Sequence, residues 1–350
     1  MNTNSDDPLA PNYDKEYDAM KWTRSNKGYS ASGEPENYAT TFQEEALKQS
    51  QACRRHESAI NRADYSVMYG RPDDPDHGIE AFDWFPPQTF NLSSIQMFVF
   101  VHGGGWQLFN LEESSYWATP VTEAGAIFVS LSYRLCPWQS IQSMIYQLCK
   151  GMCKVYDHTL ERIEQEIGNN APDVNISLVG YSSGGHLVAE MIAQADECSE
   201  ENRRWLNRVI NVITISGAFD LRPFVHTVWN KAVGFKSTDE AWSVSPLRHF
   251  TELVASSPIR SDSLRWLICF SEYDPPTMID QSMRFAEAIR SYRSSSAGKV
   301  CAEFGAVETY CVAEEDHCSS VLSLYYGVER SPLLRRIIEF VGLLKNPVTD

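Results

Sequence analysis

Residues 174–195, VNISLVGYSSGGHLVAEMIAQA, place the strongest constraint on how this chain can fold. They begin with a short apolar run rich in β-branched residues, which predicts a buried strand. The pattern G-x-S-x-G follows from Gly180 to Gly184, and a helical pattern comes directly after it. Glycine allows such a turn to be very tight, and a tight turn between a strand and a helix exposes the Ser182 hydroxyl. Because this five-residue pattern also occurs in ordinary turns, its interpretation depends on whether the rest of the chain carries the other parts of a catalytic site.

Apolar runs alternate with helical patterns on both sides of this stretch. The apolar run Ile95–Val101 predicts a strand buried on both faces, Ala126–Ser132 predicts another buried strand, and strands are also expected at Val209–Ser216 and Leu264–Phe270. Two further strands are expected within Asp64–Pro87, and a last one near Thr309–Val312. Helices are expected at Tyr38–Ala63, Glu112–Glu123, Ile141–Glu166, Gln281–Arg293 and Leu333–Leu344. This alternation predicts an α/β protein with a mostly parallel central sheet flanked by helices.

Two regions of the chain lack this periodicity. Residues 1–38 are polar and acidic, and we expect a partly disordered N-terminal arm, part of which packs on the body through tyrosines such as Tyr17. Residues 39–350 are expected to form a single domain with a sizeable core. We expect small cap elements over a pocket near residues 39–63 and 219–262, since the second of these spans has no clean period.

The composition excludes several classes of partner. A net charge of −16 disfavours nucleic acid and anionic membrane surfaces, which would be repelled. No apolar run approaches the roughly 20 residues that span a bilayer, and the polar start shows no signal-peptide pattern. The 9 cysteines are scattered singly, which predicts reduced thiols in a cytoplasmic protein and no metal site. A homodimer is compatible with this composition.

A glycine-rich loop, HGGGW at residues 102–106, directly follows one of the buried apolar runs. Backbone N–H groups aimed at a developing oxyanion stabilise it by about 3 kcal/mol each. We expect the amides of Gly103, Gly104 and Ser183 to form such an oxyanion hole. A phosphate-binding loop is the alternative, but the glycine spacings that it requires are absent. His102 is expected to orient the loop rather than to act as a base.

Two later segments supply the partners that a serine nucleophile needs. The predicted strand 264–270 leads into a turn that carries Asp274, the expected acid, with Glu272 as its competitor. His317 follows the last predicted strand and is the expected general base. The chain order Ser182, Asp274, His317 is the order expected for a catalytic triad on a sheet of this kind. No cofactor or metal is expected, because a triad and backbone donors suffice for acyl transfer.

Together these motifs resemble the α/β-hydrolases of the arylformamidase (kynurenine formamidase) group, near the hormone-sensitive-lipase-like esterases. The HGGGWQ of residues 102–107 is similar to the His-Gly-Gly-x-Trp signature of that group. Residues 216–235 and the Asp274-Pro275 pair are similar to its later segments, and the resemblance covers about residues 64–342. The chain departs from the group at Cys318, where Phe is common, and in its longer arm.

The resemblance implies a serine hydrolase that acts on a small aromatic amide or ester. The reaction that the resemblance most directly implies is hydrolysis of an aryl formamide of the N-formylkynurenine type, a step of tryptophan catabolism. Trp106, beside the oxyanion loop, is expected to wall the substrate pocket.

Three other functions stay open from the sequence. A carboxylesterase or amidase and an acyl-transferring cyclase, each acting on a specialised metabolite, would use the same motifs. A non-catalytic binding protein on a hydrolase scaffold commonly lacks a triad member, whereas Ser182, Asp274 and His317 are all present.

Overall fold

The computed structural model describes residues 17, 19–22, 38–59, 62–70, 79–168, 172–198, 202–251, 264–296 and 306–344. The strands are β1 (Asp64–Met68), β2 (Ala81–Phe85), β3 (Ile95–Val101), β4 (Ile127–Leu131), β5 (Val174–Tyr181), β6 (Val209–Ile215), β7 (Arg265–Tyr273) and β8 (Val307–Asp316). The α-helices are α2 (Tyr38–Ala59), α3 (Ala118–Glu123), α4 (Ile141–Ile167), α5 (Ser183–Cys198), α6 (Asn202–Leu206), α7 (Asn230–Val233), α8 (Thr238–Ser243), α9 (Pro246–Thr251), α10 (Pro276–Ser296), α11 (His317–Leu322) and α12 (Pro332–Phe340). Short 3-10 helices are η1 (Ala19–Trp22), η4 (Arg222–His226) and η5 (Ser323–Tyr326).

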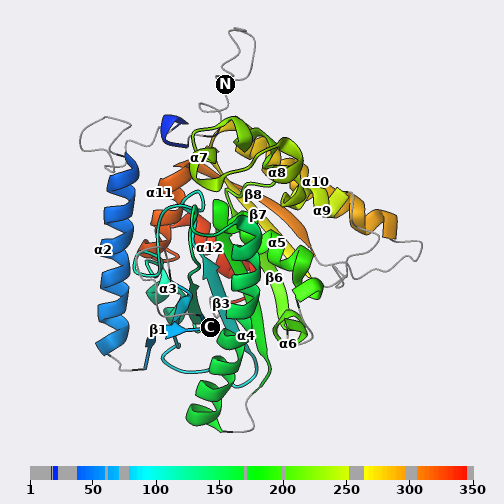
Figure 1. The fold of residues 1–350 in the computed structure, drawn as a ribbon. Coiled ribbons are helices and arrows are strands. Elements are labelled where there is room, and N and C mark those ends of the chain that lie inside the picture. Colours follow the sequence, from blue (N-terminus) through cyan, green and yellow to red (C-terminus); the bar gives the residue numbers. More distant parts are fainter. Residues whose placement is uncertain are drawn as a thin grey trace.

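The strands of the described residues form an eight-stranded sheet in the order β1-β2-β4-β3-β5-β6-β7-β8. β2 pairs antiparallel with β1 and with β4, and every other pairing is parallel. Figure 1 shows helices on both sides of this sheet, which explains why its central strands are buried on both faces and mainly apolar. The predicted α/β architecture, with a mostly parallel sheet flanked by helices, is confirmed.

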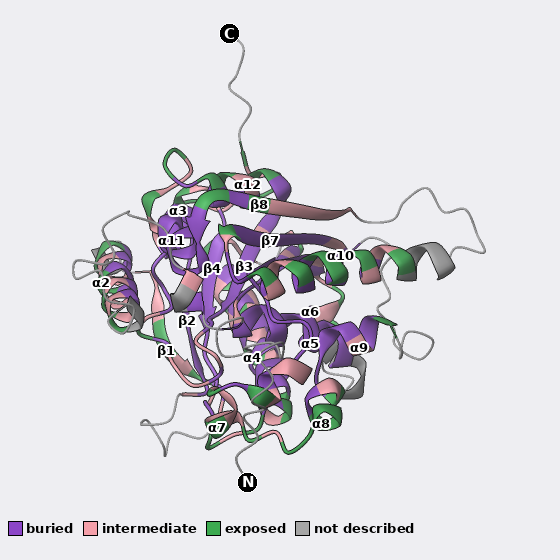
Figure 2. Ribbon diagram, turned by 90° about the horizontal axis from the view of Figure 1, so that it is seen from above, coloured by how far each residue is buried: buried purple, intermediate pink, exposed green. Residues whose placement is uncertain are grey.

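Alternate residues of each central strand contribute to two separate cores. On β3, Met97 and Val99 pack into the core beneath α4, α5 and α10, whereas Phe98 and Phe100 point to the opposite core beneath α2, α3, α11 and α12. All four side chains are fully buried. In Figure 2 the buried sheet lies between these two groups of helices. Each such side chain contributes about 1.5–3 kcal/mol through burial, so the sheet is a rigid platform for the loops at its edge.

The helix expected over Glu112–Glu123 is shorter than predicted, because only Ala118–Glu123 is helical. Side chains just before it bond to the backbone instead: Asn110 accepts from the Glu112 amide at 2.7 Å, and Glu113 accepts from the Asn110 amide at 2.9 Å. Such local bonds offer the backbone an alternative to the helix. α2 likewise ends at Ala59, before the expected Ala63.

The two regions expected to act as a cap occupy different places, and each contributes a residue to the pocket lining, Phe42 and Trp229 among them. α2 stands along one side of the body, and α7 and α8 lie above the sheet in Figure 1. Residues 60–61 and 252–262 of the expected cap lie outside the described residues. The division into an arm of residues 1–38 and a single domain of residues 39–350 stays a prediction. One sheet that contains β1 to β8 supports the single domain.

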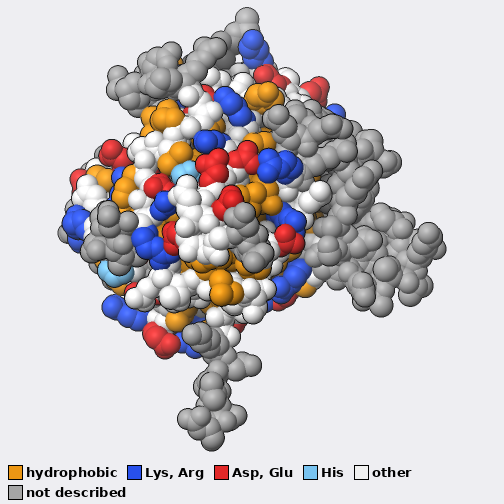
Figure 3. Space-filling model, turned by 90° about the horizontal axis from the view of Figure 1, so that it is seen from below, with side chains coloured by type: hydrophobic (Ala, Val, Ile, Leu, Met, Phe, Trp, Pro, Cys, Tyr) orange, Lys and Arg blue, Asp and Glu red, His pale blue; other side chains and the backbone are white. Residues whose placement is uncertain are grey.

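The surface carries both signs of charge. On the face shown in Figure 3, basic and acidic side chains are interspersed rather than gathered by sign. Among the described helices, none combines the length and the apolar character needed to cross a membrane. The described residues include seven cysteines with free thiols, of which Cys311 is exposed.

Parallel strands place their following residues at one edge of the sheet. β3 ends at Val101, β5 at Tyr181, β6 at Ile215 and β7 at Tyr273, and the next residues all belong to the predicted site or touch it. β8 ends at Asp316, one residue before His317. Segments that are far apart in the sequence therefore converge at this edge, which is where open α/β sheets bind ligands.

Candidate active site

Ser182 occupies the sharp turn between β5 and α5. Its φ of 53° lies in the left-handed region, which costs a residue with a side chain about 1–3 kcal/mol. Gly180 and Gly184 on either side must be glycine, because neither position has room for a side chain. A Cβ on Gly180 would lie 2.3 Å from the Gly184 carbonyl oxygen, and one on Gly184 would lie 2.2 Å from that of Val101. The predicted turn is confirmed, and it holds the serine hydroxyl above the sheet edge.

His317 is the first residue of α11, and a capping box fixes that helix end. The Asp316 carboxylate accepts from the amides of Cys318 at 3.0 Å and Ser319 at 2.8 Å. In return the Ser319 hydroxyl accepts from the Asp316 amide at 2.9 Å. The Tyr181 hydroxyl also donates to the His317 carbonyl oxygen at 3.0 Å. The imidazole is thus carried by a backbone that is bonded on both sides.

An irregularity in the β7–β8 pairing brings this helix end into place. Ser271 pairs with Val312, but Tyr273 pairs with Asp316, so two steps on β7 match four steps on β8. The two extra residues form a bulge that bends β8. Bulges often redirect a side chain next to a functional site, and this one precedes His317 directly.

Asp274 is buried, 2% exposed, and both of its carboxylate oxygens are bonded. Oδ1 lies 2.7 Å from His317 Nδ1. Oδ2 accepts from the Ser216 hydroxyl and from the Ser271 amide, each at 2.6 Å. Glu272, the competitor, is exposed and accepts from a backbone amide of β8 at 2.8 Å. The structure therefore places Asp274, and not Glu272, against the imidazole.

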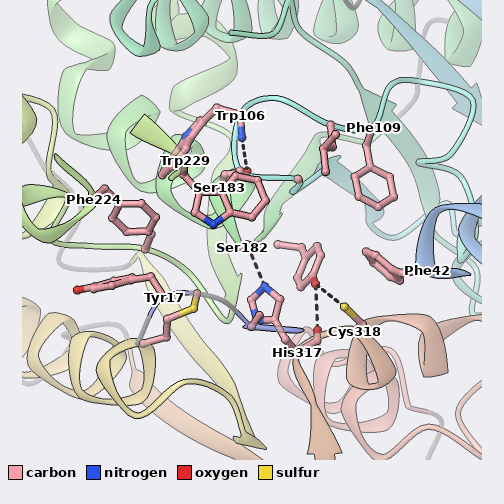
Figure 4. Close-up of a pocket in the computed structure, with 17 residues that line it drawn as sticks. Tyr17, Phe42, Trp106, Phe109, Ser182, Ser183, Phe224, Trp229, His317 and Cys318 are labelled. Atoms are coloured by element: carbon pink, nitrogen blue, oxygen red, sulfur yellow. Dashed lines mark hydrogen bonds between the residues drawn. The ribbon is translucent and has the colours of Figure 1, made fainter. Parts of the chain in front are cut away.

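The other imidazole nitrogen completes a chain of hydrogen bonds. His317 Nε2 lies 3.0 Å from the Ser182 hydroxyl, and Figure 4 shows this contact as a dashed line. Ser182, His317 and Asp274 come from three separate strand ends, yet the fold brings them within bonding distance of one another. This geometry allows the imidazole to take a proton from the hydroxyl while the carboxylate holds its other N–H.

The glycine-rich loop passes beside the serine. Gly104 has a φ of 101°, which only glycine adopts without strain. Gly103 has no room for a side chain, because a Cβ there would lie 2.8 Å from the Tyr181 carbonyl oxygen. The Ser183 hydroxyl accepts from the Trp106 amide at 3.2 Å, which ties the loop to the start of α5. Gly104 and Ser183 line the pocket around the serine, whereas Gly103 does not, although it adjoins the serine side chain. First-turn amides of a helix such as that of Ser183 have no partner within the helix.

His102 supports this loop and is buried. Its ring stacks on Tyr133 with centroids 4.5 Å apart, and Nδ1 donates to the Gly103 carbonyl oxygen at 2.9 Å. Burial lowers the pKa of His102 to about 4, so the ring is neutral near neutral pH. The expected role as an orienting residue fits this position.

His186 forms a second connection beneath the loop. The Trp106 indole N–H donates to His186 Nδ1 at 3.2 Å, and His186 Nε2 donates to the Val244 carbonyl oxygen at 2.7 Å. Burial lowers the pKa of His186, which favours the neutral ring that this pattern requires. The imidazole therefore joins the loop, α5 and the segment before α9.

A pocket opens above the serine, and the space within it and its open mouth is about 790 Å³. Trp106 lines it, as expected. The other lining residues are Tyr17, Ala19, Phe42, Gly104, Gly105, Leu108, Phe109, Tyr181, Ser182, Ser183, Ala218, Phe224, Trp229, Met278, His317 and Cys318. Phe42, Phe109, Phe224 and Trp229 were not predicted to line the pocket, because long-range packing brings them there and leaves no local pattern. The support that Ser216 gives Asp274 was also missed, although its place after β6 was a usable signal.

Within the described residues, no group of three or more His, Cys, Asp or Glu side chains could hold a metal ion.

Comparisons with known proteins agree with this architecture. The model of the alpha/beta hydrolase fold family matches residues 98–303. A kynurenine formamidase of Danio rerio is 26% identical over 264 residues, covering 74% of this chain and 76% of that protein. The kynurenine formamidase of Salmo salar is 26% identical and covers 61% of this chain, which spans 65% of that protein, just under two thirds. A solved Silicibacter structure, named as a candidate thioesterase, has a TM-score of 0.64 at 23% identity and covers 88% of this chain and 96% of its own. Since the family model matches more than half of the chain, the protein belongs to the alpha/beta hydrolase family and is a hydrolase.

Proposed function

We propose that this hydrolase cleaves a small aromatic amide or ester by a two-step mechanism with Ser182 as the nucleophile. The observation that carries the proposal is the bonded chain from Ser182 through His317 to Asp274, at 3.0 and 2.7 Å. Ser182 and His317 line a largely apolar pocket in a chain of the hydrolase family.

In the first step His317 Nε2 takes the Ser182 proton as the hydroxyl oxygen attacks the carbonyl carbon. Asp274 accepts from Nδ1–H, which fixes the tautomer and stabilises the imidazolium that forms. The negative charge on the carbonyl oxygen is held by the amides of Gly104 and Ser183, with Gly103 as the third donor. His317 then protonates the leaving amine or alcohol, and water releases the acyl group from Ser182 by the same route.

The acyl group and the leaving group are the finer part of the proposal. The similarity to two kynurenine formamidases supports an aryl formamide of the N-formylkynurenine type, in which an aniline nitrogen leaves and formate is released. A carboxylesterase is the second candidate. The apolar lining on both sides of the serine favours it, because such walls accept an acyl chain as readily as an aromatic ring.

Labelling with a fluorophosphonate tests the mechanism first. We expect the wild-type protein to label and the Ser182→Ala variant not to label, while the two unfold at similar temperatures. Hydrolysis of formanilide and of p-nitrophenyl butyrate by both proteins then assigns the reaction. A wild-type protein that neither labels nor hydrolyses these compounds would point to a binding protein on this scaffold instead. Equal hydrolysis by the variant would show that Ser182 is not the nucleophile.

A further inference from the structure

We infer that the substrate is uncharged on both sides of its scissile carbonyl, so that neutral compounds are preferred to a free amino acid such as N-formylkynurenine. This inference rests on the proposed function, because it concerns the pocket around the proposed nucleophile. It comes from the chemistry of the two pocket walls and from what their polar atoms already bind.

The first wall lies toward the cap. The Tyr17 ring is 4.5 Å from Phe224, and the Phe224 ring meets the Trp106 ring edge-on at 5.4 Å. Trp229 packs so closely on Gly105 that a Cβ there would lie 2.7 Å from its ring. Figure 4 shows Tyr17, Phe224 and Trp229 together on one side of the serine–histidine pair. This wall offers ring faces and edges to a ligand.

The second wall lies toward α2. The Phe42 ring contacts Phe109 at 5.1 Å and Tyr181 at 6.2 Å, and Cys318 lies next to Tyr181. Figure 4 shows Phe42, Phe109 and Cys318 on the opposite side of the serine from the first wall. Burial raises the pKa of the Cys318 thiol, so this residue is neutral as well. A substrate with its carbonyl at Ser182 would therefore extend along apolar walls in both directions.

The polar atoms of both walls are largely bonded within the protein. The Tyr17 hydroxyl accepts from Gln281 Nε2 at 2.5 Å, and the Tyr181 hydroxyl donates to a carbonyl oxygen. The Trp106 indole N–H donates to His186, and the Ser183 hydroxyl accepts from the Trp106 amide. Among the described residues that line the pocket, none is Lys, Arg, Asp, Glu, Asn or Gln.

Two charged side chains of the neighbouring cap segment, Arg222 and Asp220, are paired with each other. Arg222 donates to the Asp220 carboxylate at 2.6 and 2.9 Å, and its guanidinium lies over the Trp242 ring at 4.0 Å. Arg284 also reaches Asp220, at 3.7 Å. None of these residues lines the pocket.

A charge that enters such a pocket loses hydration and gains no partner of opposite charge from the described residues that line it, which is strongly unfavourable. N-formylkynurenine carries an α-ammonium and an α-carboxylate, and the described walls offer a counter-ion to neither. The aryl formamide portion of that molecule has no charge and fits the aromatic lining. The structure therefore favours neutral aryl formamides, anilides or esters.

The test compares two aryl formamides that share a ring and differ in the charged group: N-formyl-L-kynurenine and 2′-formamidoacetophenone. We expect kcat/KM for the neutral 2′-formamidoacetophenone to be higher by at least roughly tenfold. Bound N-formyl-L-kynurenine would have to leave its two charged groups without partners on the described walls. The neutral p-nitrophenyl butyrate and the anionic p-nitrophenyl hemisuccinate repeat the comparison with the charge on the acyl side. An equal or higher kcat/KM for the charged member of either pair would overturn the inference.

Binding to the Ser182→Ala variant, measured by calorimetry, separates the inference from the proposed function. If the wild-type protein hydrolyses none of the four compounds, the proposed function fails, but the binding ratio still decides the inference. We expect 2′-formamidoacetophenone to bind at least about tenfold more tightly than N-formyl-L-kynurenine. Equal affinity, or tighter binding of the amino acid, would overturn it.

A charge placed on the wall provides the matched control. Leu108 is half-buried at the pocket, so Leu108→Arg can present a cation there, and Leu108→Met keeps the wall neutral. We expect the neutral-to-charged ratio for the butyrate and hemisuccinate pair to fall about fivefold or more with Arg and to change less than about twofold with Met. An unchanged ratio in the Arg variant would mean that the walls do not select against charge.

Discussion

Asp274 and Glu272 are separated by one residue, yet only the Asp274 carboxylate faces His317, with Oδ1 2.7 Å from Nδ1. β7 extends to Tyr273, so Glu272 is still part of a strand whose side chains alternate between faces. The buried Ser271 and the exposed Glu272 show this alternation directly. The strand end then turns and delivers the next carboxylate to the sheet edge.

This arrangement predicts different outcomes for the two carboxylates. Asp274→Asn should reduce kcat by about 10³–10⁴, because an amide cannot hold the productive imidazole tautomer. Glu272→Gln should change kcat by less than about threefold, since a neutral oxygen still accepts from the same amide. Steady-state kinetics on one ester substrate measure both variants. A larger loss in Glu272→Gln than in Asp274→Asn would reverse the assignment of the acid.

The position of Gly104 in the proposed oxyanion loop predicts that replacing it by alanine affects kcat far more than the same change at Gly125. Gly104→Ala should reduce kcat by about 10²–10³, because a Cβ there would lie 2.4 Å from the Leu108 carbonyl oxygen and displace the proposed donor. Gly125 has a similar φ, +91°, but nothing lies within 4 Å of its Cβ position. Gly125→Ala therefore carries the backbone strain alone and should retain kcat. Equal kinetics for the two variants would remove the loop from the mechanism.

The lowered pKa of His102 predicts that the free energy of unfolding decreases at acidic pH. Its pKa is about 4 in the folded protein and 6.5 when unperturbed, so the unfolded state binds more protons between these values. Stability from this group is fully present above pH 6.5 and falls with pH, by about 3 kcal/mol at pH 4. Urea unfolding of the wild type and of His102→Asn at pH 7 and pH 4 measures this. The wild type should lose about 3 kcal/mol more than the variant, and parallel losses would contradict the prediction.

The attachment of α2 to the sheet predicts a stability effect far from the serine. Asp83 is fully buried on β2 and accepts from Arg54 Nε at 2.9 Å, the Ser66 amide at 2.9 Å and the Ser115 hydroxyl at 3.2 Å. Asp83→Ala should lower the free energy of unfolding by about 3 kcal/mol, because it leaves the Arg54 charge and two other donors without their acceptor.

An exposed ion pair on the same helix is the control for this prediction. Lys48 lies 3.2 Å from Glu45, and its side chain is 76% exposed. Lys48→Ala should change the free energy of unfolding by less than about 0.5 kcal/mol, as is usual for surface pairs. Chemical denaturation measures both variants, and a similar small change in each would show that the buried pair does not anchor α2.

Local pattern was sufficient to predict most of the fold. The strand Ile95–Val101 has the predicted bounds because its run is apolar except for Gln96 and is flanked by the polar residues Ser94 and His102. Helix α4 also begins at the predicted residue, where the Ser140 hydroxyl caps it by accepting from the Ser143 amide. The helix expected from Glu112 was wrong in its first half, because side-chain bonds to the backbone compete there with the helix.

The sequence by itself determined that a serine stands on a tight turn between a strand and a helix, and that an acid and a histidine follow in order. Those features depend on local backbone geometry, which the 180–184 glycines and the apolar runs encode. Only the tertiary structure decided which carboxylate faces His317, because a strand end and a bulge in β8 set that direction. It also decided that Tyr17, Phe42 and Trp229 share one pocket. These residues are more than a hundred positions apart at the extremes, and long-range packing carries no local signal.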